Sequence, residues 1–417
     1  MDGESGTTGP IGRFGSRHVE RYGLFLTAMM LFGIGVGLFY GVRDNYLAWL
    51  GVGKAGRGVV EFFRELPGLL LLLLLAPFYR QAERHIIRFA LGISALGILG
   101  FLLVGTNVAL VVVCLTIWSI GEHLVMPVRR SYAIHSAETG QEGRALGFLM
   151  GLENAGRVTG FAVVPLIFAV PAVRLDRDAG GRAGFMVVFA AVGAALILAF
   201  AVALMLAGTK GQLERKRLYI RRKFMRYYGL EVFYGARKQV FFTFAPYLLI
   251  LHYGAQTEYL ASLLGICALI NIFMTPVIGR VIDRIGYRMV MIGDTVILFF
   301  VCLAYGFAHR IFPGPIAFGF VTAIFIIDSI VSGASMASSV YVSRISKDKE
   351  EMTSTLSTGI SVNHLFSVAI ALIGGVIWEA LGVEILFITA AVMAVGNTLF
   401  AMTIPKIKSS SRAIIES

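Results

Sequence analysis

The chain has 417 residues, of which 57% are hydrophobic and only 15% are charged, and its mean hydropathy is +0.78. A soluble domain carries about 25% Asp, Glu, Lys and Arg, so this composition excludes a soluble enzyme, a nucleic-acid-binding module and a disordered protein. The net charge of +12 instead suggests basic residues kept on one side of a membrane.

Long apolar segments follow one another along the whole chain. A membrane-spanning helix needs about 20 mostly apolar residues, and we find twelve such segments separated by polar loops. They are 22–47, 59–78, 86–104, 108–128, 145–170, 183–207, 227–251, 258–281, 289–308, 314–342, 352–378 and 383–404.

The basic residues between these segments predict their orientation. If the N-terminus is cytoplasmic, 26 Lys and Arg fall on that side and six on the other, with five inside the segments. Cytoplasmic loops carry the excess of Lys and Arg in membrane proteins. We therefore predict an all-α membrane protein with twelve transmembrane helices and both termini cytoplasmic. The first segment is too long for a signal-peptide core and should stay uncleaved.

The most basic loop, 208–226, lies near the middle of the chain, with six segments before it and six after it. It should face anionic lipid and not nucleic acid. Phe39-Tyr40-Gly41-Val42-Arg43 in the first segment also recurs as Phe233-Tyr234-Gly235-Ala236-Arg237 in the seventh. The expected domains are a cytoplasmic arm (1–21), an N-terminal six-helix bundle (22–207), a basic linker (208–226), a C-terminal six-helix bundle (227–404) and a cytoplasmic tail (405–417).

The loop between the eighth and ninth segments carries a recognisable motif, GRVIDRIGYR at 279–288. It resembles the G-x-x-x-D-R-x-G-[RY]-[RK] motif of the major facilitator superfamily, and together with the twelve segments the resemblance covers essentially the whole chain. The resemblance implies the fold of that family, in which two six-helix bundles surround a central cavity. It also implies alternating access, in which the bundles rock so that the cavity faces one side and then the other.

This motif predicts a conformational latch on the cytoplasmic face. Gly279 permits a close helix approach and Gly286 permits a tight turn. Asp283 can accept hydrogen bonds from a helix N-terminus, whose dipole favours an anion. Arg284 and Arg288 can pair with acids or lipid headgroups.

Charged residues inside the segments require an explanation, since one at the bilayer centre costs about 2.5–3.5 kcal/mol. The intramembrane cations are Arg43, Arg64, Arg157, Arg237 and Lys238. They lie in segments that the family resemblance implies line the central cavity.

Two Tyr-x-x-Arg pairs are the first candidates for substrate binding, namely Tyr40 with Arg43 and Tyr234 with Arg237. A guanidinium offers a planar fork suited to carboxylate or phosphate, which favours an anionic substrate. The alternative is internal pairing of each arginine with an acid such as Asp44, Glu61 or Glu231.

Further candidates for the same cavity lie in the fifth and eleventh segments. Glu153 and Arg157 are four residues apart on one helix face, with Asn154 beside them, and form either a structural ion pair or a pair that opens for substrate. Asn363 and His364 lie in a polar stripe of the eleventh segment. Such stripes often serve close packing, but we expect a cavity role here.

Glu122, Glu153 and Asp328 are the candidates for proton coupling. Glu122 and Asp328 have no cation three or four residues away on their own helix, and burial without a partner favours the protonated carboxyl. A structural role is the alternative. The cluster of Glu61, Arg64 and Glu65 is expected to form a gate near the outer face.

The sequence thus predicts a monomeric secondary active transporter of a small polar or anionic organic solute, coupled to protons, in the plasma or inner membrane. Its partners would be a small-molecule substrate, a proton and the lipid bilayer, with no nucleic acid. Export of amphipathic drugs or lipids and a transporter-like sensor are the alternatives. The chain has no phosphate-binding loop, no nucleophile elbow and no His, Cys or acid spacing typical of a metal site. We therefore predict no enzymatic activity, no metal site and no cofactor.

Overall fold

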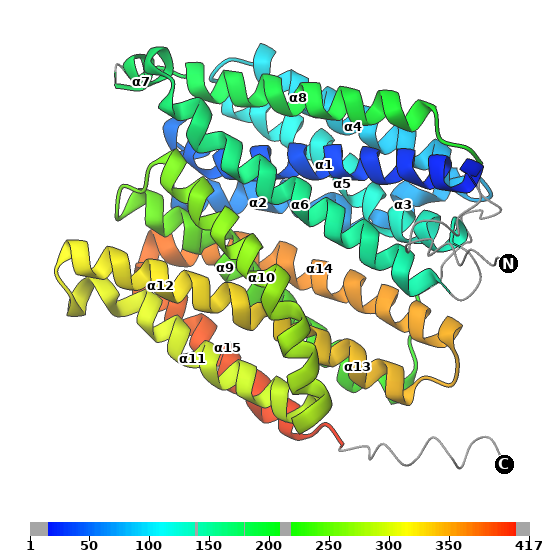
Figure 1. The fold of residues 1–417 in the computed structure, drawn as a ribbon. Helices are drawn as coiled ribbons and strands as arrows, with labels where there is room; N and C mark the ends of the chain where they lie inside the picture. The colour runs from blue at the N-terminus through cyan, green and yellow to red at the C-terminus, as the bar shows by residue number, and fades with distance from the viewer. Residues whose placement is uncertain (1–15, 138–140, 179, 209–217, 406–417) are drawn as a thin grey trace, which may run out of the picture.

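The computed structural model describes residues 16–137, 141–178, 180–208 and 218–405. All regular elements in these ranges are helical (Figure 1). The first part of the chain forms α1 (Ser16–Trp49), α2 (Lys54–Leu69), α3 (Leu71–Leu75), η1 (Ala76–Phe78), α4 (Glu83–Leu103), α5 (Val108–His135), α6 (Glu142–Ala169), α7 (Pro171–Asp178) and α8 (Ala183–Leu204). Most of the predicted arm, linker and tail lies outside the described residues.

The second part of the chain continues the same architecture. It forms η2 (Arg222–Phe224), α9 (Met225–Leu251), α10 (Thr257–Ile285), α11 (Tyr287–Ile311), α12 (Gly314–Ser332), η3 (Gly333–Ser335), α13 (Met336–Ile345), α14 (Lys349–Leu381) and α15 (Val383–Met402). In Figure 1 helices α1–α8 occupy the upper part of the view and α9–α15 the lower part.

Every one of the twelve predicted segments coincides with helical chain. Nine helices in the described ranges are long and apolar enough to cross a membrane, and a tenth is obtained if α6 and α7, bent by 73°, are one span. Helices α2 and α9 are not among the nine, because α2 has only 16 residues and α9, with 27, is not apolar enough. The count of twelve spans therefore stays a prediction.

Two segments that we expected to be continuous are interrupted. The segment 59–78 divides into α2, α3 and η1, and Pro67 lies in the last turn of α2. Proline removes a helical hydrogen bond and clashes with the preceding turn. The segment 314–342 divides at η3, where Gly333 begins a 3-10 turn. Short 3-10 turns often mark such breaks within a helical segment.

Small residues let α1 and α6 pack closely. Added side-chain carbons at Gly156 and Gly160 would collide with the backbone of α1, and one at Gly37 would collide with the backbone of α6. Gly147 and Gly151, also in α6, have open space beside them. Close packing of this kind replaces the hydrophobic effect as a driving force between membrane helices.

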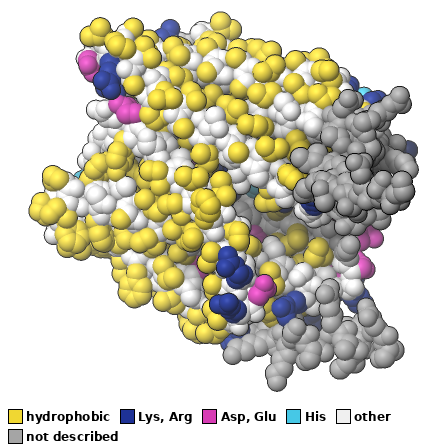
Figure 2. All heavy atoms as spheres, viewed as in Figure 1, with side chains coloured by type: hydrophobic (Ala, Val, Ile, Leu, Met, Phe, Trp, Pro, Cys, Tyr) yellow, Lys and Arg dark blue, Asp and Glu magenta, His cyan; other side chains and the backbone are white. Residues whose placement is uncertain are grey.

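Hydrophobic side chains cover the middle of the face seen in Figure 2, whereas charged side chains gather at its ends, near α7 and near the lower end of α10. Many large hydrophobic residues are exposed, among them Leu96, Phe273 and Leu399. An apolar belt with charged ends fits a chain surrounded by lipid tails.

Candidate functional site

A cavity of about 810 Å³ lies mainly among α9, α10, α12, α13 and α14, with two residues contributed by α5 and α6. Its volume is in the range of small-molecule sites. The charged and amide side chains that line it are Arg130, Glu231, Arg237, Lys238, Asp328 and Asn363. Three of these are cations and two are acids, so the wall carries a surplus of positive charge.

Arg237 is held in this wall by two acids from other helices. Its Nη1 donates to both carboxylate oxygens of Asp294 on α11, at 2.6 and 2.7 Å. Its Nη2 lies 3.5 Å from Oδ1 of Asp328 on α12. Glu231, the partner that the sequence suggested, instead accepts hydrogen bonds from Ser338 and Asn363, each at 3.2 Å.

Three polar atoms of this wall are buried without hydrogen-bond partners in the described part of the chain. They are the hydroxyl of Tyr234, Nη2 of Arg237 and Oδ1 of Asp328. Two donors and one acceptor therefore border the same cavity. Because burying a polar atom without a partner is costly, a polar ligand would be stabilised there.

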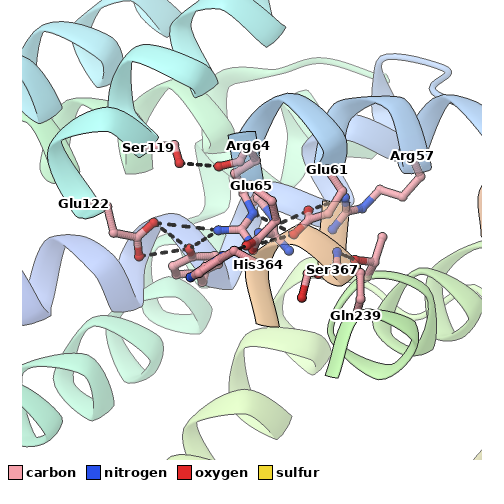
Figure 3. A network of polar contacts seen from close by, with 12 residues as sticks. Arg57, Glu61, Arg64, Glu65, Ser119, Glu122, Gln239, His364 and Ser367 are labelled. Carbon is pink, nitrogen blue, oxygen red and sulfur yellow. Dashed lines mark hydrogen bonds and ion pairs between the residues drawn. The ribbon is translucent and has the colours of Figure 1, made fainter. Parts of the chain in front are cut away.

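The first Tyr-x-x-Arg pair lies in a different environment, among charged residues of which Arg57, Glu61, Arg64, Glu65 and Glu122 are labelled in Figure 3. Arg57 on α2 lies 2.9 Å from Asp44 and 2.7 Å from Glu61, and Arg64 lies 2.5 Å from Glu61 and also pairs with Glu65. Arg43 is 3.1 Å from Asp44. All these charged side chains are buried.

Tyr40 and Arg43 are therefore not in the cavity wall, in contrast to our expectation. The hydroxyl of Tyr40 donates to the carboxylate of Glu122 at 2.9 Å and accepts from Arg64 at 3.2 Å. Arg43 is paired with acids, which was the alternative interpretation. Glu122, which we expected to be buried without a cation partner, has Arg64 from α2 at 3.9 Å. Asp328 likewise has Arg237 as a cation from another helix.

The expected pair of Glu153 and Arg157 is present at 3.2 Å. Arg129 on α5 makes a shorter contact of 2.5 Å with the same carboxylate oxygen of Glu153, a partner that the sequence did not indicate. Asn154 and Arg157 are partly exposed and do not line the 810 Å³ cavity.

His364 is likewise directed away from this cavity. Its Nδ1 lies 2.7 Å from Oε2 of Glu65, 299 residues earlier in the chain. Asn363, its neighbour, does line the cavity. Adjacent positions on a helix point about 100° apart. Asn363 therefore faces the cavity while His364 faces Glu65 on α2.

The predicted latch is only partly formed. Gly286 has φ +86° and is the single residue between α10 and α11, and Arg288 donates to the carbonyl of Met402 at 2.5 Å. Gly279, however, has open space beside it, so no close helix approach occurs there. Asp283 and Arg284 are exposed.

The opposite end of the molecule, where α1 ends and α2 begins, is closed by contacts between the two parts of the chain. Asn45 donates to the carbonyl of Ala255 at 2.9 Å, and Tyr247 donates to the carbonyl of Val52. A side-chain carbon at Gly58 of α2 would collide with the backbone of α14. The two parts of the chain are thus packed together at this end.

Several residues of the site were missed as candidates. Asp294, Arg129, Arg130 and Lys238 were not assigned a role, although Lys238 and Asp294 were visible as charges in apolar segments. That position alone is a signal for function in a membrane helix. The ion-pair partner of each of these residues cannot be predicted from the sequence when it lies on a helix distant along the chain.

A bundle of apolar helices with a charged internal cavity defines the class of multi-pass membrane transport proteins. The sequence model of the Major Facilitator Superfamily matches residues 65–327 and 227–416. The chain belongs to this superfamily and is a secondary transporter by class.

Solved structures agree in fold. The D-xylose-proton symporter has 15% identity and a TM-score of 0.72, covering 92% of this chain and 97% of its own. A POT family transporter in complex with 5-aminolevulinic acid has 12% identity and a TM-score of 0.73, with 92% and 96% covered. The nucleoside transporter NupG has 12% identity and a TM-score of 0.70, with 94% and 100% covered. At such identities the likeness concerns the fold alone. No curated protein sequence matches the chain.

Proposed function

We propose that this chain transports a small polar or anionic organic solute by alternating access, coupled to protons. The observation that carries the proposal is the positively charged wall of the 810 Å³ cavity, where the Tyr234 hydroxyl has no hydrogen-bond partner and Arg237 Nη2 is held only by its 3.5 Å ion pair with Asp328. A guanidinium with one face held by Asp294 is already oriented, so little rotamer entropy is lost when an anion binds.

The proposed membrane arrangement has twelve spans in two six-helix bundles, 22–207 and 227–404, with both termini cytoplasmic and the chain monomeric in the plasma or inner membrane. The excess of basic residues on one side supports this orientation. The end closed by Asn45 and Tyr247 would then face outward, and the cavity would be reached from the cytoplasm.

Asp328 is the proton carrier that we favour among the three candidates. Its carboxylate lies 3.5 Å from Arg237 Nη2. Protonation of Asp328 would release that guanidinium nitrogen for an anionic solute, so that proton and solute binding would be linked. Glu122 and Glu153 are held by Tyr40 and by two arginines respectively, which gives each a structural role as its alternative.

Export of amphipathic drugs or lipids is a second candidate, favoured by the apolar part of the cavity wall. Phe241, Phe242, Phe325, Met150 and Met336 lie there, and methionine and aromatic side chains adapt to varied apolar surfaces. An amphipathic substrate would use these residues and depend little on Arg237.

The test begins with a thermal-shift screen of metabolites, drugs and lipids on the purified protein. Solutes that stabilise it are then offered to proteoliposomes with an imposed pH gradient. Accumulation of a polar anion against its gradient supports the proposal. Accumulation of amphipathic compounds alone supports the second candidate, and stoichiometric binding without transport supports a sensor.

A further inference from the structure

Two histidines and a glutamate converge in the interior of the molecule, outside the cavity described above. Glu65 on α2, His123 on α5 and His364 on α14 are all buried, and one ligand atom from each lies within 4.8 Å of the other two. Two imidazoles with one carboxylate are a common ligand set for Zn²⁺ and related ions.

The tautomer of His123 is fixed by its own helix. Its Nδ1 lies 2.8 Å from the carbonyl oxygen of Ser119, and a carbonyl only accepts hydrogen bonds. Nδ1 therefore carries the proton, and in the neutral ring Nε2 carries the lone pair. Such a second contact to a backbone carbonyl is typical of metal-binding histidines.

Gly68 marks the point on which the imidazoles converge. A side-chain carbon built on Gly68 would lie 2.6 Å from Nε2 of His123 and 2.7 Å from Nδ1 of His364. The absence of a side chain at this position leaves both nitrogens facing one small space. Both ring nitrogens thus lie against the backbone of α2, three residues from Glu65, with no side chain of residue 68 between them.

The charged groups around this point balance one another. The ion pairs that connect to Glu65 involve four acids, namely Asp44, Glu61, Glu65 and Glu122, and three arginines, namely Arg43, Arg57 and Arg64. Lys238 on α9 also interacts electrostatically with Glu65 and is the fourth cation. Figure 3 places His364 against these ion pairs, with Glu65 between His364 and Arg64.

We propose that Glu65, His123 and His364 bind a divalent transition-metal ion of the zinc type between α2, α5 and α14. The ion would connect helices from the first and the second part of the chain. It would bind the conformation in which α2 and α14 are packed together, and hold that conformation by mass action. If the chain also transports a solute as proposed above, the ion would slow the exchange.

Titration of the purified full-length protein with Co²⁺ tests the proposal without any transport assay. We expect one Co²⁺ per chain, with visible absorption bands that Zn²⁺ abolishes by displacement. His123→Ala, His364→Ala and Gly68→Ala should each weaken Co²⁺ binding by at least about tenfold, the last because its methyl group would collide with both imidazoles and displace them.

A matched control uses the other neighbouring imidazoles of the described chain. His252 and His309 have ring centroids 4.9 Å apart, and the double variant His252→Ala with His309→Ala should bind Co²⁺ normally. His364→Cys covers the case in which an alanine variant fails to fold, because it adds a signal, a thiolate-to-cobalt charge-transfer band in the near ultraviolet. No stoichiometric Co²⁺ binding by the unaltered chain, or its loss only in the control, would overturn the proposal.

Discussion

Two copies of one short sequence, Tyr40 to Arg43 in α1 and Tyr234 to Arg237 in α9, have opposite surroundings. Arg43 is one of three arginines that form, with four acids, a dense buried network around Tyr40. Around Arg237 there are two acids and an open cavity wall, with the Tyr234 hydroxyl unpartnered. A sequence repeat thus does not imply a functional repeat, because the neighbouring helices decide whether the arginine is used for structure or is available to a ligand.

The largest expected effect concerns the first of these regions. Glu61→Gln should lower the free energy of unfolding by about 3–5 kcal/mol, because it leaves buried arginines without their shared partner. Thermal unfolding of the purified protein measures this. Glu258→Gln is the control, since its pair with Arg177 is partly exposed and should contribute less than about 1 kcal/mol. Equal effects would contradict the view that the network is structural.

The second prediction separates the two arginines directly. Arg237→Gln should weaken binding of an anionic solute by about 1.5–3 kcal/mol, roughly 10- to 100-fold, the value of a charged hydrogen bond. Arg43→Gln should lower thermal stability but leave the affinity nearly unchanged. Isothermal titration of both variants with a solute from the screen measures the two affinities. If neither variant changes the affinity, the anion site is elsewhere.

The third prediction compares Asp328 with Glu122. A single coupled proton gives up to about a tenfold change in uptake per pH unit. Asp328→Asn should remove most of this dependence in proteoliposomes, whereas Glu122→Gln should leave it and mainly affect stability through Tyr40. An unaltered pH profile in Asp328→Asn would exclude this residue as the carrier.

The smallest effect is expected at the contacts between the two parts of the chain. Gly58→Ala should disfavour the closed packing of α2 on α14 by about 1–3 kcal/mol, the usual cost of overpacking. Gly279→Ala, beside open space, is the control and should change little. Spin-label distances between α2 and α14 report the change, and no difference between the variants would contradict the packing argument.

Much of the fold followed from hydropathy, because twelve apolar runs leave few options other than helices. The interruptions at Pro67 and Gly333 are harder to predict from the sequence, since one proline or glycine can bend a helix, end it or be tolerated. Within the site, the pair of Glu153 and Arg157 was readable from its spacing along one helix. The partners Asp294 and Arg129 were not, because contacts between helices depend on rotation about each axis, which hydropathy leaves undetermined.

In both hydrogen bonds that close one end of the molecule, the donor is a side chain and the acceptor is a main-chain carbonyl. Asn45 and Tyr247 supply the side chains, but the groups that accept from them are the main-chain carbonyls of residues 255 and 52. A carbonyl is present whatever amino acid occupies the position. A substitution at residue 52 or 255 therefore leaves the acceptor in place and acts only through the buried side chain, whereas a substitution at Asn45 or Tyr247 removes the hydrogen bond itself.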